Sequence, residues 1–257
     1  MFHHQGLTRS DRENRIVAGY LAFIGGFVNS AGYLLIGSFT SHVTGNVGRL
    51  AKDVAALQLN AAVAALTMII AFFTGAFAAS MAIESDFFRK VPYAYSFALF
   101  CEGALLVMFM LISRLTTTAH PQLQDAEAAI LCAAMGMQNS LVTRLSGAVV
   151  RTTHLTGVVT DLGIESARWF RWWRSSLSER VHVRLSFGQP SPEKPSSVKV
   201  ALLGTIAGAF MVGAVAGAGA VVHWHHATML IPSVGLFLCA IYAFVNGRGD
   251  AGPESRA

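Results

Sequence analysis

Six long apolar stretches limit what this chain can fold into. They cover residues 16–39, 61–83, 91–112, 126–150, 198–222 and 227–245. About 20 apolar residues in a helix are enough to cross the hydrocarbon core of a bilayer. Only 13% of the residues are charged, which is about half the share found in soluble domains. The sequence therefore predicts an all-α polytopic integral membrane protein with about six transmembrane helices.

The distribution of Lys and Arg predicts an orientation in the membrane. Fourteen of the 19 basic residues fall in the N-terminal tail 1–15, the loops after the second and fourth stretches, and the C-terminal tail 246–257. The other loops hold Arg49, Lys52 and Arg114, while Arg144 and Lys199 lie within or at the edge of apolar stretches. Because basic residues collect in cytoplasmic loops, we expect both termini in the cytoplasm.

A small polar cluster occurs twice, each time after a long apolar stretch. It reads "SHVTGN" at 41–46 and "THLTG" at 153–157. The apolar stretches that follow share "GAF", at 75–77 and again at 208–210. The matched residues of the two copies are Gly26, Asn29, Ser30 and Gly37 with Gly136, Asn139, Ser140 and Gly147, then His42, Thr44 and Gly45 with His154, Thr156 and Gly157.

The two copies predict an inverted repeat. Each copy, 16–112 and 113–245, contains three apolar stretches, and an odd number of spans reverses the second copy in the membrane. Transporters built from inverted repeats place their sites near the midplane, on interrupted helices. A Thr-Gly pair at the start of a half-helix leaves unpaired N–H groups that can face a ligand. The two clusters are therefore interpreted as lining one cavity.

A purely structural explanation of the clusters remains open. Small residues let helices pack closely in lipid, and Ser, Thr and Asn commonly cap ordinary helices. Irregular backbone at membrane depth is tolerated only where protein or water satisfies its polar groups. The sequence does not separate a solute-facing motif from a structural turn.

The glycines and Asn29 of the first stretch, followed by "SHVTGN", "MGMQN" and "TTHLTG", resemble the YoaK-type family of uncharacterised bacterial inner-membrane proteins, a domain of unknown function. The likeness covers residues 16–245. It implies a multi-pass protein of the bacterial inner (plasma) membrane and supplies neither a substrate nor catalytic residues. The family often has an acid where this chain has Asn29, and Asn where it has Val158, which weakens a role for a carboxylate at 29 or for a symmetric Asn pair.

Polar residues inside the apolar stretches are further candidates. Glu102 lies near the middle of the third stretch, where an acid costs about 3 kcal/mol to insert; it either carries a coupled proton or fastens two helices by a hydrogen bond. Gln138 and Asn139 either bond to other helices or coordinate a polar solute. Arg144 is interpreted as reaching the cytoplasmic surface, with pairing to an acid or binding of an anion as the alternatives. The candidate substrate-binding residues are Asn29, His42, Thr44, Gly45, Asn46, Glu102, Gln138, Asn139, His154, Thr156 and Gly157.

The loop 151–197 is basic and aromatic. Arg168, Arg171 and Arg174 alternate with three tryptophans in "SARWFRWWRSS". This pattern predicts a short helix that lies in the cytoplasmic interface and contacts lipid headgroups; membrane contact is favoured over nucleic acid. The polar, proline-rich segment 186–197 predicts a flexible linker.

The remaining motifs indicate packing more than chemistry. Two GxxxG spacings in the fifth stretch, at Gly204, Gly208, Gly213 and Gly217, predict a close helix contact, either within the monomer or in a homo-oligomer. Three cysteines inside apolar stretches are interpreted as packing residues, and "HWHH" at 223–226 as an interfacial loop. No metal and no cofactor are expected.

No known enzyme motif stands in a suitable setting, so we expect the chain not to be an enzyme. The favoured function is a transporter or channel for a small polar solute or ion, with proton coupling through Glu102 as an option. The alternatives are a membrane scaffold or sensor that acts through the basic loop, and an intramembrane enzyme.

Overall fold

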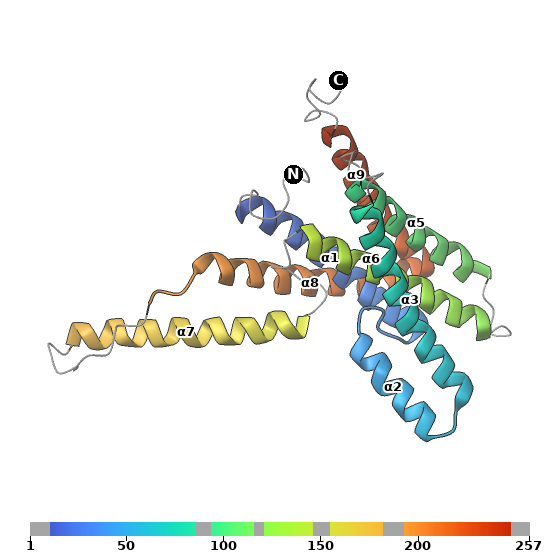
Figure 1. Cartoon of the computed structure of the whole chain (residues 1–257), viewed down its shortest axis with the longest axis horizontal. Coiled ribbons are helices and arrows are strands. Elements are labelled where there is room, and N and C mark those ends of the chain that lie inside the picture. Colours follow the sequence, from blue (N-terminus) through green and yellow to red (C-terminus); the bar gives the residue numbers. More distant parts are fainter. Residues whose placement is uncertain (1–10, 86–93, 116–120, 146–154, 182–192, 248–257) are drawn as a thin grey trace.

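The computed structural model describes residues 11–85, 94–115, 121–145, 155–181 and 193–247 (Figure 1). Within these ranges the chain is helical apart from short connections, and no strand occurs. The helices are α1 (Asp11–Ile36), α2 (Val43–Ala55), α3 (Leu59–Glu84), α5 (Ala94–Leu115), α6 (Pro121–Leu145), α7 (Leu155–Val181), α8 (Ser197–Trp224) and α9 (Leu230–Gly247), with a short 3₁₀ helix, η2 (His225–Met229), between the last two.

Each of the six apolar stretches overlaps one of the long helices α1, α3, α5, α6, α8 and α9. Two boundaries differ in an informative way. α1 ends at Ile36 and not at residue 39, because Gly37 adopts a left-handed φ of 71° and its N–H bonds back to the Tyr33 carbonyl, a common way to end a helix. The predicted short interfacial helix is instead the 27-residue helix α7, which begins at Leu155 and takes up much of the predicted basic loop.

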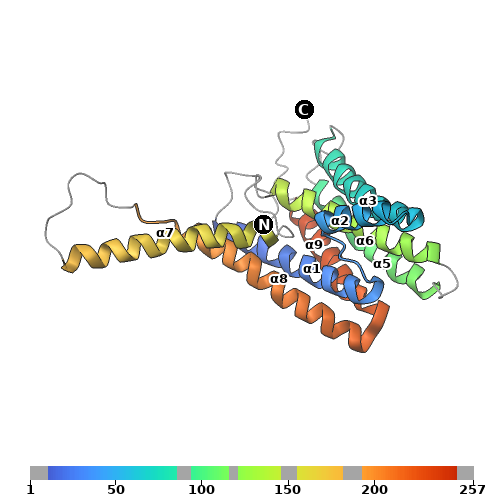
Figure 2. The same ribbon diagram turned by 90° about the horizontal axis from the view of Figure 1, so that it is seen from below.

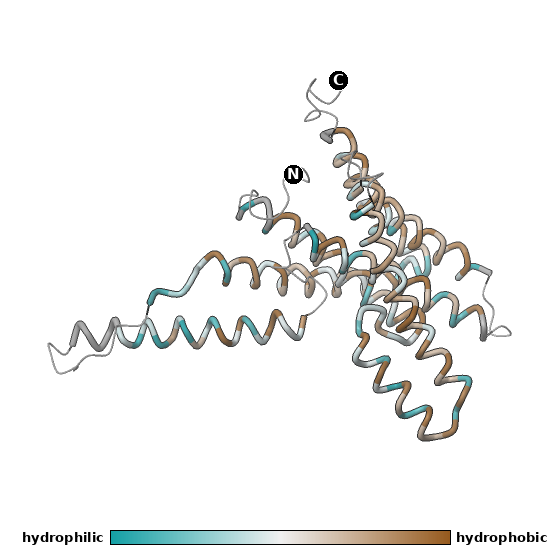
Figure 3. Tube along the Cα trace, viewed as in Figure 1, coloured by the Kyte–Doolittle hydropathy of each residue, from teal (hydrophilic) through white to brown (hydrophobic). Residues whose placement is uncertain are grey.

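Four segments of the described chain are long and apolar enough to cross a membrane: Arg15–Ile36, Leu59–Glu84, Ala94–Arg114 and Ser197–Val245. The last segment includes both α8 and α9, between which the chain turns at His225. Figure 3 shows apolar residues along α3, α5 and α9, while polar residues recur along α2 and α7. Large apolar side chains such as Phe73, which is 67% exposed, cover the outside. These features indicate a membrane protein.

The two most extensive helix contacts join α1 to α8 and α3 to α6. In each contact, two glycines lie against backbone carbonyls of the partner helix, and a Cβ on any of the four would lie only 2.0–2.1 Å from the oxygen. Gly26 faces Phe210 and Gly213 faces Phe23 in the first contact, while Gly136 faces Phe72 and Gly75 faces Ala133 in the second. Glycine at these positions is what allows the backbones to touch.

The two contacts correspond residue by residue. A shift of 110 residues takes Gly26 to Gly136, and a shift of 138 takes Gly75 to Gly213. The same two shifts relate their carbonyl partners, Phe23 with Ala133 and Phe72 with Phe210. The structural counterpart of Gly75 is therefore Gly213, so the "GAF" alignment, which pairs Gly75 with Gly208, is wrong. A Cβ at Gly208 would meet nothing within 4 Å.

The contacts also give the helix directions, which can be followed in Figures 1 and 2. α1 and α8 run parallel, since Gly19 lies beside Thr205 and Phe27 beside Gly217. α3 and α6 also run parallel, with Phe72 beside Gly136 and Ser80 bonded to Ser140. In contrast, α1 and α6 are antiparallel, because Leu21 meets Gln138 and Gly32 meets Leu131. The first helices of the two sequence copies therefore point in opposite directions.

Candidate functional site

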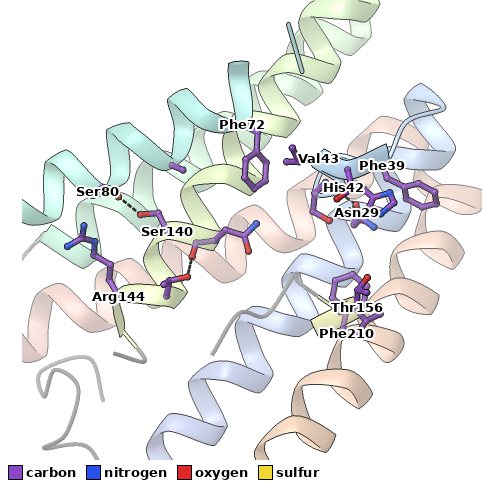
Figure 4. A pocket seen from close by; sticks show the side chains of 16 residues that line it. Asn29, Phe39, His42, Val43, Phe72, Ser80, Ser140, Arg144, Thr156 and Phe210 are labelled. Carbon is purple, nitrogen blue, oxygen red and sulfur yellow. Dashed lines mark hydrogen bonds between the residues drawn. The ribbon is translucent and has the colours of Figure 1, made fainter. Parts of the chain in front are cut away.

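A cavity of about 790 Å³ lies where the two sequence copies meet. Its wall combines residues of α1, the break after α1, α2, α3, α6, α7 and α8 (Figure 4). Four pairs of equivalent residues contribute to this wall: Asn29 with Asn139, Val43 with Leu155, Thr44 with Thr156, and Phe72 with Phe210. The cavity is thus built from corresponding positions of both copies.

Both Thr-Gly clusters begin a helix at the cavity. Thr44 is the second residue of α2 and Thr156 is the second residue of α7, and both line the wall. The first-turn N–H groups of a helix have no intrahelical acceptor and carry partial positive charge. The residue before α2, His42, makes no capping hydrogen bond from its side chain. The start of α2 therefore offers unpaired donors to a molecule in the cavity.

The break between α1 and α2 is held by Asn29. Its Oδ1 accepts hydrogen bonds from the Ser41 N–H at 3.2 Å and from the Ser41 Oγ at 2.9 Å. Asn29 lies about two turns before the end of α1, so these two bonds tie the irregular segment 37–42 back onto the helix. The amide oxygen of Asn29 thereby positions the start of α2.

This role gives a first testable prediction. Asn29→Leu removes the acceptor and leaves both Ser41 donors unpaired, so we expect it to destabilise the protein by about 2 kcal/mol. Asn29→Asp keeps an oxygen in place and should cost less, and Ser41→Ala, which loses only the hydroxyl bond, should cost about half as much. Thermal unfolding in detergent measures all three variants. Equal stability of the leucine and aspartate variants would contradict the positioning role.

The ring of His42 explains the glycine of the first cluster. A Cβ on Gly45 would lie 2.6 Å from His42 Nδ1, so only glycine lets the ring rest against the first turn of α2. The edge of the His42 ring meets Phe39, at 6.3 Å between centroids, and Phe39 stacks on Tyr33 at 4.3 Å. Gly45 therefore has a packing reason, while His42 also lines the cavity.

The opposite wall is formed by α3 and α6. Ser80 and Ser140 share a hydrogen bond of 2.7 Å between their hydroxyls. Arg144, at the end of α6, forms an ion pair with Glu84, at the end of α3, and both side chains are partly exposed. The structure therefore shows Arg144 paired with an acid, and the residue also lines the cavity.

The structure brings five of the predicted site residues together and leaves others apart. Asn29, His42, Thr44, Asn139 and Thr156 line the cavity. Gly45 and Asn46 line a smaller neighbouring cavity of about 400 Å³. The remaining candidates are outside both walls: Glu102 and Gln138 are buried in α5 and α6, Gly157 is half-buried in α7, and His154 lies outside the described residues.

Two of these buried side chains have incomplete hydrogen bonding. Gln138 Nε2 donates to the Leu21 carbonyl at 3.0 Å, which ties α6 to α1, while its Oε1 has no partner. Glu102 is 1% exposed, and its Oε1 also lacks a hydrogen-bond partner. A buried polar atom without a partner is costly in a protein interior, so Oε1 of Glu102 does not fasten α5 to another helix.

The wall also contains residues that were not among the candidate substrate-binding residues. Phe72 and Phe210 are two of these wall residues. A shift of 138 residues relates them, as it relates the glycines of α3 and α8, and the "GAF" alignment did not show this shift. Ser80, Thr143 and Phe39 lie in helices or turns where no repeat marked them. The additional wall residues are Phe39, Ser41, Val43, Phe72, Ala76, Ser80, Ser140, Thr143, Arg144, Leu155 and Phe210.

The other motifs have packing contacts. Gly213 and Gly217 lie against Phe23 and Phe27 within the monomer, whereas a Cβ on Gly204 or Gly208 would meet nothing. In "HWHH", His226 Nδ1 shares a 2.6 Å hydrogen bond with Ser113 Oγ and so joins η2 to α5. The three cysteines are free thiols. Among the described residues, no group of three or more His, Cys, Asp or Glu could hold a metal ion.

Comparisons with known proteins place the chain in a family. A search of curated proteins and a search of solved structures both gave no match. The model of the family described as "Protein of unknown function (DUF1275)", which includes the YoaK-type proteins, matches residues 17–242. Since this match covers most of its length, the chain belongs to the DUF1275 family of proteins of unknown function.

Proposed function

We propose that this protein moves a small polar solute or ion across the membrane through the cavity between two inverted repeats, residues 16–112 and 113–245. The observation that carries the proposal is the pairing of equivalent wall residues: both half-helix starts, both asparagines and both phenylalanines face one space. Alternating access by inverted repeats needs a site that both repeats share. A cavity on the boundary between the copies meets that requirement.

The helix directions support six crossings. α1 and α8 run one way, and α3 and α6 run the other way. This is the alternation that six spans require if α7 does not itself cross the membrane between α6 and α8. The two repeats would then have opposite topologies, with both termini in the cytoplasm as the basic residues predict.

α6 is the least apolar of the six proposed spans, and its packing explains why. Its central residues Leu131, Cys132, Ala134, Met135 and Gln138 are all buried by other helices. A span that does not face lipid can carry polar side chains, because protein groups surround them. Its low hydropathy is therefore compatible with a transmembrane position.

The wall chemistry favours neutral polar or anionic solutes over cations. Hydroxyl and amide groups, His42 and two phenylalanines face the space, and no carboxylate is among its described lining residues. Arg144 of α6, which lines the cavity, is already paired with Glu84. The volume of about 790 Å³ is within the range of small-molecule sites. Glu102 lies outside the wall, so any proton coupling by it would act through helix packing.

Cysteine accessibility tests this function without knowledge of the solute. In a variant with Cys101, Cys132 and Cys239 replaced by alanine, we expect Thr44→Cys and Thr156→Cys to react with a membrane-impermeant methanethiosulfonate reagent, because a hydrated cavity lets the thiol ionise. Phe73→Cys, on the lipid-facing side of α3, is the matched control and should not react. The reaction is followed by mass spectrometry in reconstituted vesicles.

The same variants distinguish the alternatives. If neither Thr44→Cys nor Thr156→Cys reacts, the cavity is closed to water and transport through it is wrong. A scaffold or sensor predicts that deletion of residues 168–197 abolishes the cellular phenotype while Thr44 and Thr156 substitutions leave it intact. An intramembrane enzyme predicts turnover of a lipid or another hydrophobic substrate by the purified protein.

A further inference from the structure

The basic and aromatic part of α7 lies beyond the start of α8. Glu165 of α7 pairs with Lys199 of α8 at 2.9 Å, and farther along α7 the Trp172 ring lies 5.6 Å from Lys194 Nζ. Lys194 precedes α8, so the two contacts show that the chain from Lys194 into α8 runs antiparallel to α7. The later residues of α7 therefore project past the N-terminus of α8, as Figures 1 and 2 show.

The Glu165 junction fixes this register. The carboxylate is nearly buried and accepts hydrogen bonds from Lys199 Nζ and Arg168 Nη1, both at 2.9 Å. The hydrogen bond from Lys199, followed by the charges of Lys199 and Arg168, lowers the pKa of Glu165. The carboxylate therefore stays ionised at neutral pH, and its bonds to Lys199 fix the position of α7 along the axis of α8.

This register also sets the distance of the Trp/Arg segment, residues 168–174, from the start of α8. α8 begins at Ser197, close to the Lys199 contact. Residues 168–174 lie three to nine positions beyond Glu165, which is about 4.5–13.5 Å along a helix. The headgroup layer extends roughly 5–8 Å beyond the hydrocarbon core. If α8 enters the hydrocarbon near its first turn, the Trp/Arg segment is in or next to that layer.

In this segment, the exposed aromatic rings and the arginines lie on neighbouring faces of the helix. Phe170 and Trp173 are 60% and 56% exposed on one flank of the helix, where aromatic rings favour the interface. The three arginines, spaced three residues apart, form a neighbouring face. Arg171 and Arg174 are exposed, and neither has an ion-pair partner in the part of the chain that the structure describes. Their charge is available to an external anion.

We propose that the Trp/Arg segment binds the phosphodiester headgroups of anionic phospholipids in the cytoplasmic leaflet, with Arg171 and Arg174 as the phosphate ligands and the exposed aromatic rings at the acyl boundary. Guanidinium groups make bidentate hydrogen bonds to phosphate oxygens, and basic residues near an anionic leaflet are attracted to it. Because the first residues of α7 line the cavity, lipid binding by the Trp/Arg segment also fixes the position of that part of the cavity wall. The inference does not depend on which solute the protein moves.

The tryptophan distribution makes a direct experiment possible. Of the four tryptophans, three are in α7 and the fourth is Trp224. In full-length Trp224→Phe protein, reconstituted in phosphatidylcholine vesicles, the fluorescence therefore reports on α7 alone. A fixed mole fraction of acyl-brominated phosphatidylglycerol is compared with the same fraction of acyl-brominated phosphatidylcholine. We expect the anionic lipid to quench severalfold more strongly, and less so at high salt.

Charge-neutral variants test the assigned residues. Each of Arg171→Gln and Arg174→Gln should lower the preference about fivefold, equivalent to about 1 kcal/mol, and the double variant should abolish it. The double variant Arg12→Gln/Arg114→Gln removes the same charge elsewhere and should keep the preference. Gel filtration shows that each variant is folded.

Three results would overturn the proposal. Equal quenching by the two brominated lipids, or none by either, would show that α7 does not select anionic headgroups. An unchanged preference in the Arg171→Gln/Arg174→Gln protein would remove the assigned ligands. Loss of the preference on addition of free glycerol phosphate would show a site for a soluble phosphate in place of a lipid.

Discussion

Gly213→Ala should destabilise the protein by about 2 kcal/mol, whereas Gly208→Ala, five residues earlier on the same helix, should leave its stability unchanged or slightly raised. A Cβ at Gly213 would lie 2.0 Å from the Phe23 carbonyl oxygen, so α1 and α8 must move apart. Forced separation of a tight contact typically costs 1–3 kcal/mol. A Cβ at Gly208 meets nothing within 4 Å, and alanine is the better helix former.

The repeat supplies a second matched test of this result. Gly75 faces the Ala133 carbonyl as Gly213 faces that of Phe23, so Gly75→Ala should cost about as much as Gly213→Ala. Thermal unfolding in detergent should show both melting temperatures lowered by about 5 °C, with that of Gly208→Ala at or above the parent value. A loss at Gly208 equal to that at Gly213 would show that the wrong face of α8 has been assigned to α1.

Glu102→Leu should raise stability by about 1–3 kcal/mol. The Glu102 side chain is 1% exposed and its Oε1 has no hydrogen-bond partner, and an unsatisfied buried polar group costs about that much. Leucine has a similar volume and removes the group. Glu102→Gln keeps a polar group in the same place and should change stability little.

The outcome also separates the two explanations of this acid. If Glu102 fastened α5 to a neighbour, the leucine variant would melt at a lower temperature than the parent. A stabilised variant that has lost a pH-dependent activity would instead indicate that the acid is retained for proton transfer, at a cost in stability. Melting temperatures of the leucine and glutamine variants, compared with flux in proteoliposomes across a pH gradient, measure both effects.

Local signals in the sequence predicted the helices well, for a physical reason. Long runs of apolar residues favour helices, in which the backbone hydrogen bonds stay within the segment, and each of the six stretches overlaps a long helix. The Thr-Gly clusters were predicted to begin half-helices, and Thr44 and Thr156 are second in α2 and α7. The predicted length of α7 was wrong. Many of its residues are polar, so the sequence showed little sign of a long helix, and contact with α8 helps to stabilise it.

The repeat could be seen in the sequence only in part. Asn29 and Asn139 share enough neighbours to be matched, and both line the cavity. The glycines of α3 and α8 could not be matched correctly from the sequence. The shared tripeptide "GAF" pairs Gly75 with Gly208, whereas the helix contacts pair Gly75 with Gly213. Only the partner backbones, Phe23 and Ala133, show that Gly213 and not Gly208 corresponds to Gly75.

By itself, the amino-acid sequence determined the helical class and the helix starts at both Thr-Gly clusters, because each depends on residues close together in the chain. Tertiary structure alone decided which faces meet: that α1 packs on α8 and α3 on α6, that Arg144 pairs with Glu84, and that a cavity opens between the copies. These contacts join residues far apart in the chain, and close backbone approach is a property of two surfaces together that neither segment carries alone.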